Sequence, residues 1–421
     1  MNSIHTNFRS GVFVAALTMI GAPAALAAEL KPGDVINAGN IDKVKGDTFE
    51  GKSVASLLTE KLEWQIRNWS LSIKLRKHEE IPVNQRDIEA TKKYSGQVKF
   101  DPATNEVTGY VAGTPFPNVD TNDPKAAYKL LYNYYYQGTI GHEFDGPYTF
   151  GLIDGEKGLE RVQRWTTTRY MMKNQSAKGS PVEGDGTMVS KTLLYAMAPY
   201  DIRGLGTFSI RHDSPQLEDN WAYIKSVRRT RRLSGGSWMD TMVGDQLNDE
   251  YDIWNARPSW YPELKVVGKR WVLAIVHSQL PIVDESKKDT VDEFPRVDLK
   301  NKPFWNPVAE WEPREVYVIE ATPPQVHPYG KKVLYMEVKY PRFYMAEYYD
   351  KSGQFWKFQQ VLTSPLKGDD GYVGLPPWQG HTIDFKRKHA TIYFGHPALK
   401  INRAGLKSDD VTLGVLESAG K

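Results

Sequence analysis

Apolar and polar residues alternate along much of the chain from about residue 148 onwards, a pattern that is typical of antiparallel β-strands. Turn-forming residues separate the alternating segments, and Ser352-Gly353 supplies a hairpin turn between two aromatic ones. No helical pattern of about 10 to 15 residues alternates with these segments, which argues against a parallel sheet. The predicted strands are 158–173, 190–198, 206–212, 219–225, 227–234, 265–278, 314–322, 331–340, 343–350 and 355–361.

Two of these segments indicate how the sheet is covered. Leu334, Met336 and Val338 fall on one face of their strand together with Lys332, while charged residues occupy the other face, which predicts a half-buried strand. In 271–276 both faces are apolar, so this strand is expected to be covered on each side. A curved sheet wrapped around helices accounts for both patterns, and the predicted fold class is mainly β with few helices.

Helical patterns lie in the first third of the chain. Residues 53–69 place leucine and tryptophan at helical spacings after Ser53, which can cap the helix. A second amphipathic helix is predicted at 123–136, with Asp123 as its cap. The segment 97–110 between them predicts a β-hairpin.

The N-terminus has the pattern of an export signal. An apolar run rich in small residues ends in Ala25-Leu26-Ala27, an A-x-A cleavage pattern. Residues 1–27 are therefore predicted to be a cleavable signal peptide, and Ala25 and Ala27 define the cleavage site. Because no cysteine follows, a lipid anchor is excluded, and the expected location is the periplasm.

The rest of the chain is predicted to form one domain, residues 28–421. No linker divides it and no repeat of fixed period is visible. Residues 283–307 are polar and contain proline, which predicts one long loop. The tail from about residue 400 is only weakly patterned.

Composition narrows the function classes. The 54 Lys and Arg against 51 Asp and Glu leave a net charge of +3, which is too balanced for a nucleic-acid binder. Cysteine is absent, which excludes disulfides, thiolate zinc sites and cysteine nucleophiles. None of the nine histidines has a ligand-like partner at close spacing, and no nucleotide-binding motif is present. Neither a metal nor a cofactor is therefore expected.

One acidic segment offers a catalytic alternative. Asp245, Asp249, Glu250 and Asp252 lie close together in the sequence, and paired carboxylates can serve glycoside hydrolysis. A secreted carbohydrate-active enzyme is therefore the alternative function, although a solvated, charged loop is the favoured interpretation of this segment. An outer-membrane barrel is disfavoured, because polar loops and helices interrupt the strands and the C-terminus is polar.

The densest positive charge is a run of four arginines, Arg228, Arg229, Arg231 and Arg232. Four guanidinium groups in five residues could hold anionic headgroups or an acidic partner. On a strand, however, they split between two faces, and an ordinary solvated strand face is the alternative interpretation.

Several longer motifs resemble a known family. Residues 221–254 (WAYIKSVRRTRRLSGGSWMDTMVGDQLNDEYDIW) resemble the bacterial outer-membrane lipoprotein-sorting-type proteins, whose fold is that of the LolA and LolB carriers. The remaining motifs are similar to the domain-of-unknown-function 1329 family, and the resemblance covers most of 30–362. These motifs are Gly113–Asn118 (GTPFPN), Val267–Arg270 (VGKR), Trp311–Ala321 (WEPREVYVIEA) and Tyr348–Trp356 (YYDKSGQFW).

The resemblance implies an open antiparallel half-barrel with helices over its concave face, which enclose an apolar cavity. Proteins of this type hold or ferry lipids or lipid-like groups between two membranes. This chain is larger than a minimal carrier, and the segments near 176–189 and 283–307 are loop insertions without a counterpart there. The motifs carry no catalytic signature.

The expected function is therefore that of a non-enzymatic periplasmic carrier for a lipid, lipoprotein or other hydrophobic cargo moving between the inner and outer membranes. Its expected partners are this ligand and an inner-membrane transporter or outer-membrane acceptor, and the protein is expected to be a monomer. Eight apolar strand residues are expected to be buried as cavity lining or, alternatively, as simple core. They are Trp271, Leu273, Ile275, Tyr317, Ile319, Leu334, Met336 and Val338.

Overall fold

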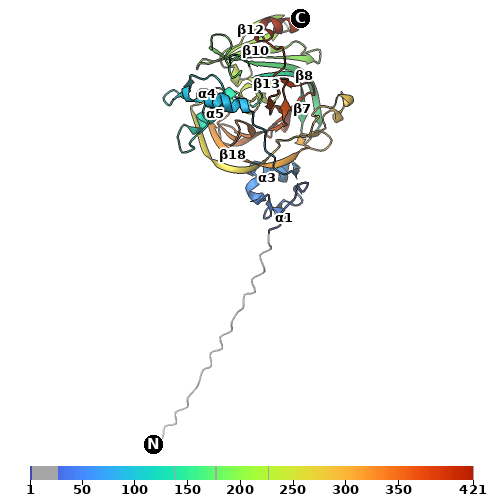
Figure 1. Cartoon of the computed structure of the whole chain (residues 1–421). Coiled ribbons are helices and arrows are strands. Elements are labelled where there is room, and N and C mark those ends of the chain that lie inside the picture. Colours follow the sequence, from blue (N-terminus) through green and yellow to red (C-terminus); the bar gives the residue numbers. More distant parts are fainter. Residues whose placement is uncertain (2–26, 138, 176–177, 226, 421) are drawn as a thin grey trace.

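The alternating segments pair into one large curved sheet that bends around a central helix (Figure 1). The structure, a computed structural model, describes Met1 and residues 27–420 apart from 138, 176–177 and 226. Within these residues, 14 strands follow one another across the sheet, and two more attach beside them. All pairings are antiparallel except that of β4 with β18.

The strands of the main sheet, in spatial order, are β1 (Val35–Ile36), β4 (Ile73–Leu75), β18 (Glu310–Thr322), β19 (Lys331–Glu337), β20 (Phe343–Tyr349), β21 (Phe355–Thr363), β24 (Pro377–Asp384), β25 (His389–Gly395), β7 (Glu143–Asp154), β8 (Gly158–Met171), β9 (Met188–Ala198), β10 (Gly206–His212), β11 (Asp219–Ile224) and β12 (Arg229–Arg232). Strand β15 (Glu263–Ala274) pairs with β18, and β26 (Lys400–Ile401) pairs with β7. Two-stranded pairs are β2 (Thr48–Phe49) with β3 (Lys52–Ser53), β5 (Lys99–Asp101) with β6 (Glu106–Thr108), β13 (Thr241–Val243) with β14 (Gln246–Leu247), β16 (Val297–Asp298) with β17 (Asn306–Pro307), and β22 (Leu366–Lys367) with β23 (Val373–Gly374).

The sheet does not close into a barrel, since β1 and β12 lie at its two ends without pairing to each other. The mainly β, antiparallel and open fold class predicted from the sequence is confirmed. The division into a signal peptide and one domain stays a prediction. Residues 2–26, which include Ala25, lie outside the described part of the chain, and Ala27 is exposed.

The helices cover both faces of the sheet. They are α1 (Ile41–Val44), α2 (Val54–Leu57), α3 (Glu60–Asn68), α4 (Gln85–Tyr94), α5 (Ala126–Gln137) and α6 (Leu413–Gly420). In the described part of the chain, no helix is long and apolar enough to cross a membrane.

Helix α5 lies on the inner, concave face of the sheet, as the sequence predicts. Its Leu131 packs in one cluster with Ile319 and Leu334. Figure 1 shows α3 on the other side of β18, where Leu62 packs with Val316. The expectation that the helices cover the concave face therefore holds for α5 but is wrong for α2 and α3, because the outer face also carries apolar residues that need burial.

Strand β19 corrects a second expectation, that of a half-buried strand. Lys332, Leu334 and Met336 are buried on one face as predicted, and this is the inner face. Val333 and Glu337 on the opposite face are buried as well. The N-terminal helices cover that outer face. Glu337 remains satisfied there, because the Nε of Arg314 lies 2.9 Å from its carboxylate.

The helix expected over 53–69 is divided into α2 and α3. Leu58 is extended between them, and the Thr59 hydroxyl accepts a hydrogen bond from the backbone N–H of Leu62, so that a second N-cap starts α3. The predicted hairpin over 97–110 is confirmed as β5 and β6.

The long loop expected over 283–307 is a packed insertion instead. It contains the β16–β17 pair and covers the outer face of β24 and β25, where Phe294 stacks on Phe394 with ring centroids 4.2 Å apart. The weakly patterned tail forms β26 and α6, whose Leu416 is buried against the sheet. Strands β7, β24 and β25 and helix α4 are further elements that the sequence pattern does not predict.

A buried histidine joins this insertion to the sheet. His381 of β24 lies 2.8 Å from the carbonyl oxygen of Trp305 through Nδ1 and 2.7 Å from the amide nitrogen of Gln379 through Nε2. Because a carbonyl oxygen can only accept, Nδ1 carries the proton and Nε2 accepts from Gln379. Burial lowers the pKa of His381 from its ordinary 6.5 to about 4.

We expect this histidine to make the stability of the protein depend on pH. The unfolded chain takes up the proton near pH 6.5 and the folded chain only near pH 4, so the unfolding free energy is highest above pH 6.5 and falls towards pH 4. The loss through this group reaches about 3 kcal/mol. His381→Gln keeps a donor and an acceptor but cannot titrate, and urea denaturation should then show a shallower dependence on pH.

A matched control for this variant is Gln at His396, which is more exposed and lies outside the buried joint. His142, whose pKa burial also lowers to about 4, should leave part of the pH dependence in every variant. An identical pH slope for His381→Gln and the unmodified protein would contradict the prediction.

Candidate functional site

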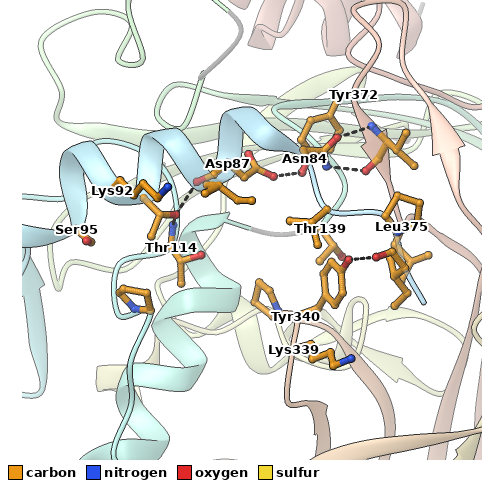
Figure 2. A pocket seen from close by; sticks show the side chains of 18 of the residues that line it. Asn84, Asp87, Lys92, Ser95, Thr114, Thr139, Lys339, Tyr340, Tyr372 and Leu375 are labelled. Atoms are coloured by element: carbon orange, nitrogen blue, oxygen red, sulfur yellow. Dashed lines mark hydrogen bonds between the residues drawn. The ribbon is translucent and has the colours of Figure 1, made fainter. Parts of the chain in front are cut away.

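A pocket of about 450 Å³ opens beside helix α4 (Figure 2). Asp87, Ile88 and Thr91 lie along one side of this helix and form one wall. Tyr340, which follows β19, and Leu375, which follows β23, line the pocket from the sheet side (Figure 2). The lining therefore combines apolar side chains with polar groups.

Helix α4 is fixed to the rest of the fold by hydrogen bonds at this pocket. The Asn84 side chain donates to and accepts from the backbone of Val373, both at 2.9 Å. The Tyr372 hydroxyl lies 2.9 Å from a carboxylate oxygen of Asp87 (Figure 2). These contacts hold the helix over the end of the sheet.

The motif Gly113–Asn118 approaches α4 from the other side and contributes Thr114, Pro117 and Asn118 to the lining. Gly113 has φ +77°, and a Cβ there would lie 2.4 Å from the backbone nitrogen of Thr91. Only glycine allows this close approach. One of the motifs that carry the family resemblance thus helps to shape the pocket.

Thr139 lines this pocket (Figure 2) and also a second cavity of about 20 Å³. The threonine is 8% exposed, and its hydroxyl has no hydrogen-bond partner among the described residues. The second cavity shares Arg169 and Arg211 with a third one of about 80 Å³, which lies on the inner face of β8, β9 and β10. Three neighbouring cavities thus extend from α4 to the inner face of the sheet.

The eight apolar residues predicted as cavity lining lie elsewhere. Six are buried, whereas Trp271 and Val338 are only partly buried. Trp271, Leu273 and Ile275 belong to the cluster that contains α2 and α3. Tyr317, Ile319, Leu334, Met336 and Val338 belong to the cluster that contains α5. None of the eight lines the three cavities described above, so their role in ligand binding stays a prediction.

The four arginines predicted as a headgroup or partner site are all exposed, at or beside the free edge strand β12. Arg232 pairs with Asp219, whereas Arg228, Arg229 and Arg231 have no ion pair with any residue that the structure describes. The register places Arg231 opposite Ala222 of β11, which in turn lies opposite Thr207 of β10 in the third cavity. Arg229 and Arg231 are therefore on the inner face of the sheet edge.

Sequence reasoning missed the residues that line the cavities. Arg169 and Arg211 look like solvent-facing positions of alternating strands, because nothing in the pattern shows that another segment covers them. The signal that could have found them is the run Thr166–Arg169, where polar residues occupy both strand faces of a central strand. Helix α4 was missed because its sequence, QRDIEATKKY, contains only one aliphatic residue larger than alanine.

Fold and cavities together define a mainly β protein with an open, curved sheet, a pocket beside α4 and two smaller inner cavities. The chain belongs to the DUF1329 family, since the model of that family, described as a protein of unknown function, matches residues 35–396. This confirms the family that the sequence motifs predict.

Three solved structures are similar to the chain. A DUF1329 family protein from Desulfovibrio piger is 16% identical with a TM-score of 0.46, over 70% of this chain and 98% of that one. A putative outer membrane lipoprotein-sorting protein domain from Vibrio parahaemolyticus is 15% identical with a TM-score of 0.43, over 66% and 92%. A LolA superfamily protein from Nitrosomonas europaea is 14% identical with a TM-score of 0.40, over 69% and 98%. A search of curated proteins gave no match.

The acidic segment of the enzyme alternative is buried, so the favoured interpretation as a solvated loop is wrong. Asp245, Asp249, Glu250 and Asp252 are each at most 4% exposed. Each is already engaged: Asp245 with His389, Asp249 with Lys332, Glu250 with the backbone N–H of Leu247, and Asp252 with Arg342. Among the described residues, no group of three or more His, Asp or Glu is placed to hold a metal ion.

Asp249 is the centre of the most buried of these contacts. One of its oxygens lies 2.6 Å from the Nζ of Lys332, 2.7 Å from the Tyr261 hydroxyl and 3.0 Å from Nε2 of His327. Burial acts to raise the pKa of Asp249, but Lys332 and His327 outweigh it and hold that pKa below its ordinary range. Lys332 is fully buried, and the nearest aromatic ring centroid, that of Tyr348, is 5.4 Å from its Nζ.

We expect Lys332→Met to destabilise the fold strongly, because it leaves the Asp249 carboxylate buried without its cation. Removing one partner of a buried ion pair costs about 3 to 5 kcal/mol. The double variant Lys332→Met/Asp249→Asn should recover part of this loss. Urea denaturation of the two variants measures both effects.

Lys331 on the same strand provides the control, because it is 42% exposed and pairs with Glu320 at the surface. Lys331→Met should change the unfolding free energy by about 1 kcal/mol or less. Equal losses for Lys331→Met and Lys332→Met would show that the buried pair is not the cause.

Proposed function

We propose that the protein is a periplasmic carrier that holds a lipid or another hydrophobic ligand while it moves between the inner and outer membranes. The observation that carries this proposal is the pocket beside α4, together with the cavities that adjoin it through Thr139. Its volume of about 450 Å³ lies within the range of small-molecule sites, roughly 300 to 1,000 Å³. Its apolar part is formed by residues such as Ile81, Ile88 and Leu375.

Binding of a hydrophobic ligand needs no catalytic group. Each buried methylene contributes about 0.8 kcal/mol, so a long acyl chain can be held by burial alone. The carboxylates that would serve a carbohydrate-active enzyme are each engaged by a residue of the chain itself. This favours the carrier over the enzyme.

One end of the sheet has the composition of a membrane-docking surface. Met197 at the end of β9 is 48% exposed, Tyr200 in the turn between β9 and β10 is 82% exposed, and Val227, before β12, is 46% exposed. This turn contacts the segment that follows β11, because the Nζ of Lys225 lies 4.4 Å from the ring centroid of Tyr200. Exposed apolar residues beside the arginines of β12 suit a membrane surface with anionic headgroups.

Narrowing the pocket should reduce the amount of bound lipid. Ile88→Trp with Val83→Trp places two indoles in the pocket beside α4, and organic-solvent extraction with mass spectrometry measures the lipid that co-purifies. We expect a stoichiometric lipid in the unmodified protein and about half or less in this variant. Gln85→Trp with Glu89→Trp is the control, because these exposed residues of α4 do not line the pocket.

An empty extract from the unmodified protein, combined with turnover of a glycan, would favour the enzyme instead. Equal lipid in the pocket variant and in the α4 control would place the ligand elsewhere in the fold.

Removing two arginines should weaken membrane docking. Arg229→Gln with Arg231→Gln is expected to lower binding to anionic vesicles at low salt by about 10- to 30-fold, since each basic residue near the surface contributes about 1 kcal/mol. The difference should shrink as salt screens the charges. Folding should be retained, because exposed strand charges contribute little to stability.

The control Lys265→Gln with Lys269→Gln removes the same charge from two exposed positions of β15, a strand far from β12 in the sheet order. Vesicle co-sedimentation at low and high salt compares the two variants. If the arginine variant binds vesicles as well as the unmodified protein at low salt, these arginines belong to an ordinary solvated strand face.

A further inference from the structure

Arg169 of β8 is a partly buried cation without a counter-ion among the described residues. It lines the two inner cavities, and its side chain makes no ion pair or hydrogen bond to the part of the chain that the structure describes. The carboxylates that line the same cavities, Glu218 and Asp252, are taken by other arginines. Arg211 binds Glu218 at 2.7 Å, and Arg342 binds Asp252. One positive charge in this interior is therefore uncompensated.

Such a charge is unfavourable in a protein interior unless something neutralises it. Burial lowers the pKa of the Arg169 guanidinium, as expected where negative charge is in short supply. An arginine nevertheless stays charged near neutral pH. The free protein thus carries an electrostatic cost at this position that a bound anion would relieve.

The walls around Arg169 supply hydroxyl groups at regular positions. Thr192 of β9 lies directly opposite Arg169, and Ser209 of β10 lies opposite Thr192. The neighbouring rows add Ser190 and Thr207 on the same face. In the described structure, none of these four side-chain hydroxyls has a hydrogen-bond partner, although all four line the third cavity.

The segment that covers the cavity adds further polar groups. Asn255 accepts from Arg211 at 2.7 Å through its side chain and so fixes the second guanidinium. Tyr251 also lines both inner cavities. A planar guanidinium surrounded by free hydroxyl donors is suited to an oxyanion, which it can bind through two parallel hydrogen bonds.

We propose that the cavity at Arg169 binds the acid group, a carboxylate or phosphate, of an amphipathic ligand whose apolar part extends past Thr139 into the pocket beside α4. The proposal rests on the proposed carrier function and adds the chemical class of the ligand. Thr139 is the residue common to the outer pocket and the inner cavity. The third cavity, about 80 Å³, has room for a head group of a few atoms, whereas the second, about 20 Å³, is of the size of one water molecule and has to widen for the chain to pass.

The test compares an acid, its neutral analogue and small anions. Calorimetry measures binding of dodecanoate, dodecanol, acetate and inorganic phosphate to the full-length mature protein after delipidation. The unmodified protein should bind dodecanoate about 10- to 100-fold more tightly than dodecanol, as expected for hydrogen bonds to a charged group. Arg169→Gln should abolish this preference and leave dodecanol binding unchanged. Arg169→Lys keeps the charge but cannot donate two parallel hydrogen bonds to one anion, so it should retain part of the preference.

Arg203→Gln is the matched control, because Arg203 is exposed and lies outside the cavities. It should not change any of the affinities. A second readout is the melting temperature of the ligand-free protein. Arg169→Gln should raise it, because an uncompensated charge is removed, whereas Arg342→Gln should lower it by leaving Asp252 unpaired.

The outcomes separate this inference from the function on which it rests. Equal affinity for dodecanoate and dodecanol, unaffected by Arg169→Gln, overturns the acid-group site and leaves the carrier function intact. Acetate or phosphate bound as tightly as dodecanoate shows a small-anion site and overturns the amphipathic ligand. Binding of neither amphiphile overturns the proposed carrier function itself.

Discussion

An open, strongly curved sheet has two large faces that must both be covered, and this requirement determines most of the structure. On the outer face, the N-terminal helices, the insertion at 283–307 and α6 cover successive groups of strands. On the inner face, α5 and the segment around 238–261 fill the half formed by β18 to β21. They do not fill the half formed by β8 to β10, where the inner cavities remain. The internal space is thus a consequence of curvature combined with partial filling.

The two halves of the inner face differ in whether their buried cations are paired with a carboxylate. In the filled half, Lys332 is buried among aromatic rings and bound to Asp249, so its charge is neutralised within the chain. In the open half, the partly buried Arg169 lines the inner cavities without a carboxylate of its own. A neutralised pair resists rearrangement, since separating it exposes two buried charges. An unpaired charge is not constrained in this way, and a ligand can provide the negative group that the chain does not.

The sequence was sufficient for most of the sheet, because the alternation that marks each strand is local. The strands from β8 to β12 and from β18 to β21 were predicted near their observed positions, and Lys332 was placed on the same face as Leu334 and Met336 from its register alone. The covering of the outer face could not be predicted, since the residues that bury Val333 and Glu337 are far away in sequence. Arg169 was missed for the same reason: a polar residue on a strand has the same local pattern whether water or a cavity faces it.

The structure shows that the polar residues on the inner face of β8 to β10 face cavities, and this bears on function. If the inner face of β8 to β10 served stability alone, apolar residues against the covering segment would bury more surface and remove an unpaired charge. Instead that face carries Arg169 and the hydroxyls of Ser190, Thr192, Thr207 and Ser209, which have no side-chain partner in the described structure. Natural proteins usually depart from their stability optimum where function requires it. The polarity of this face, held between well-packed regions on both sides, is therefore better explained by a ligand than by the fold.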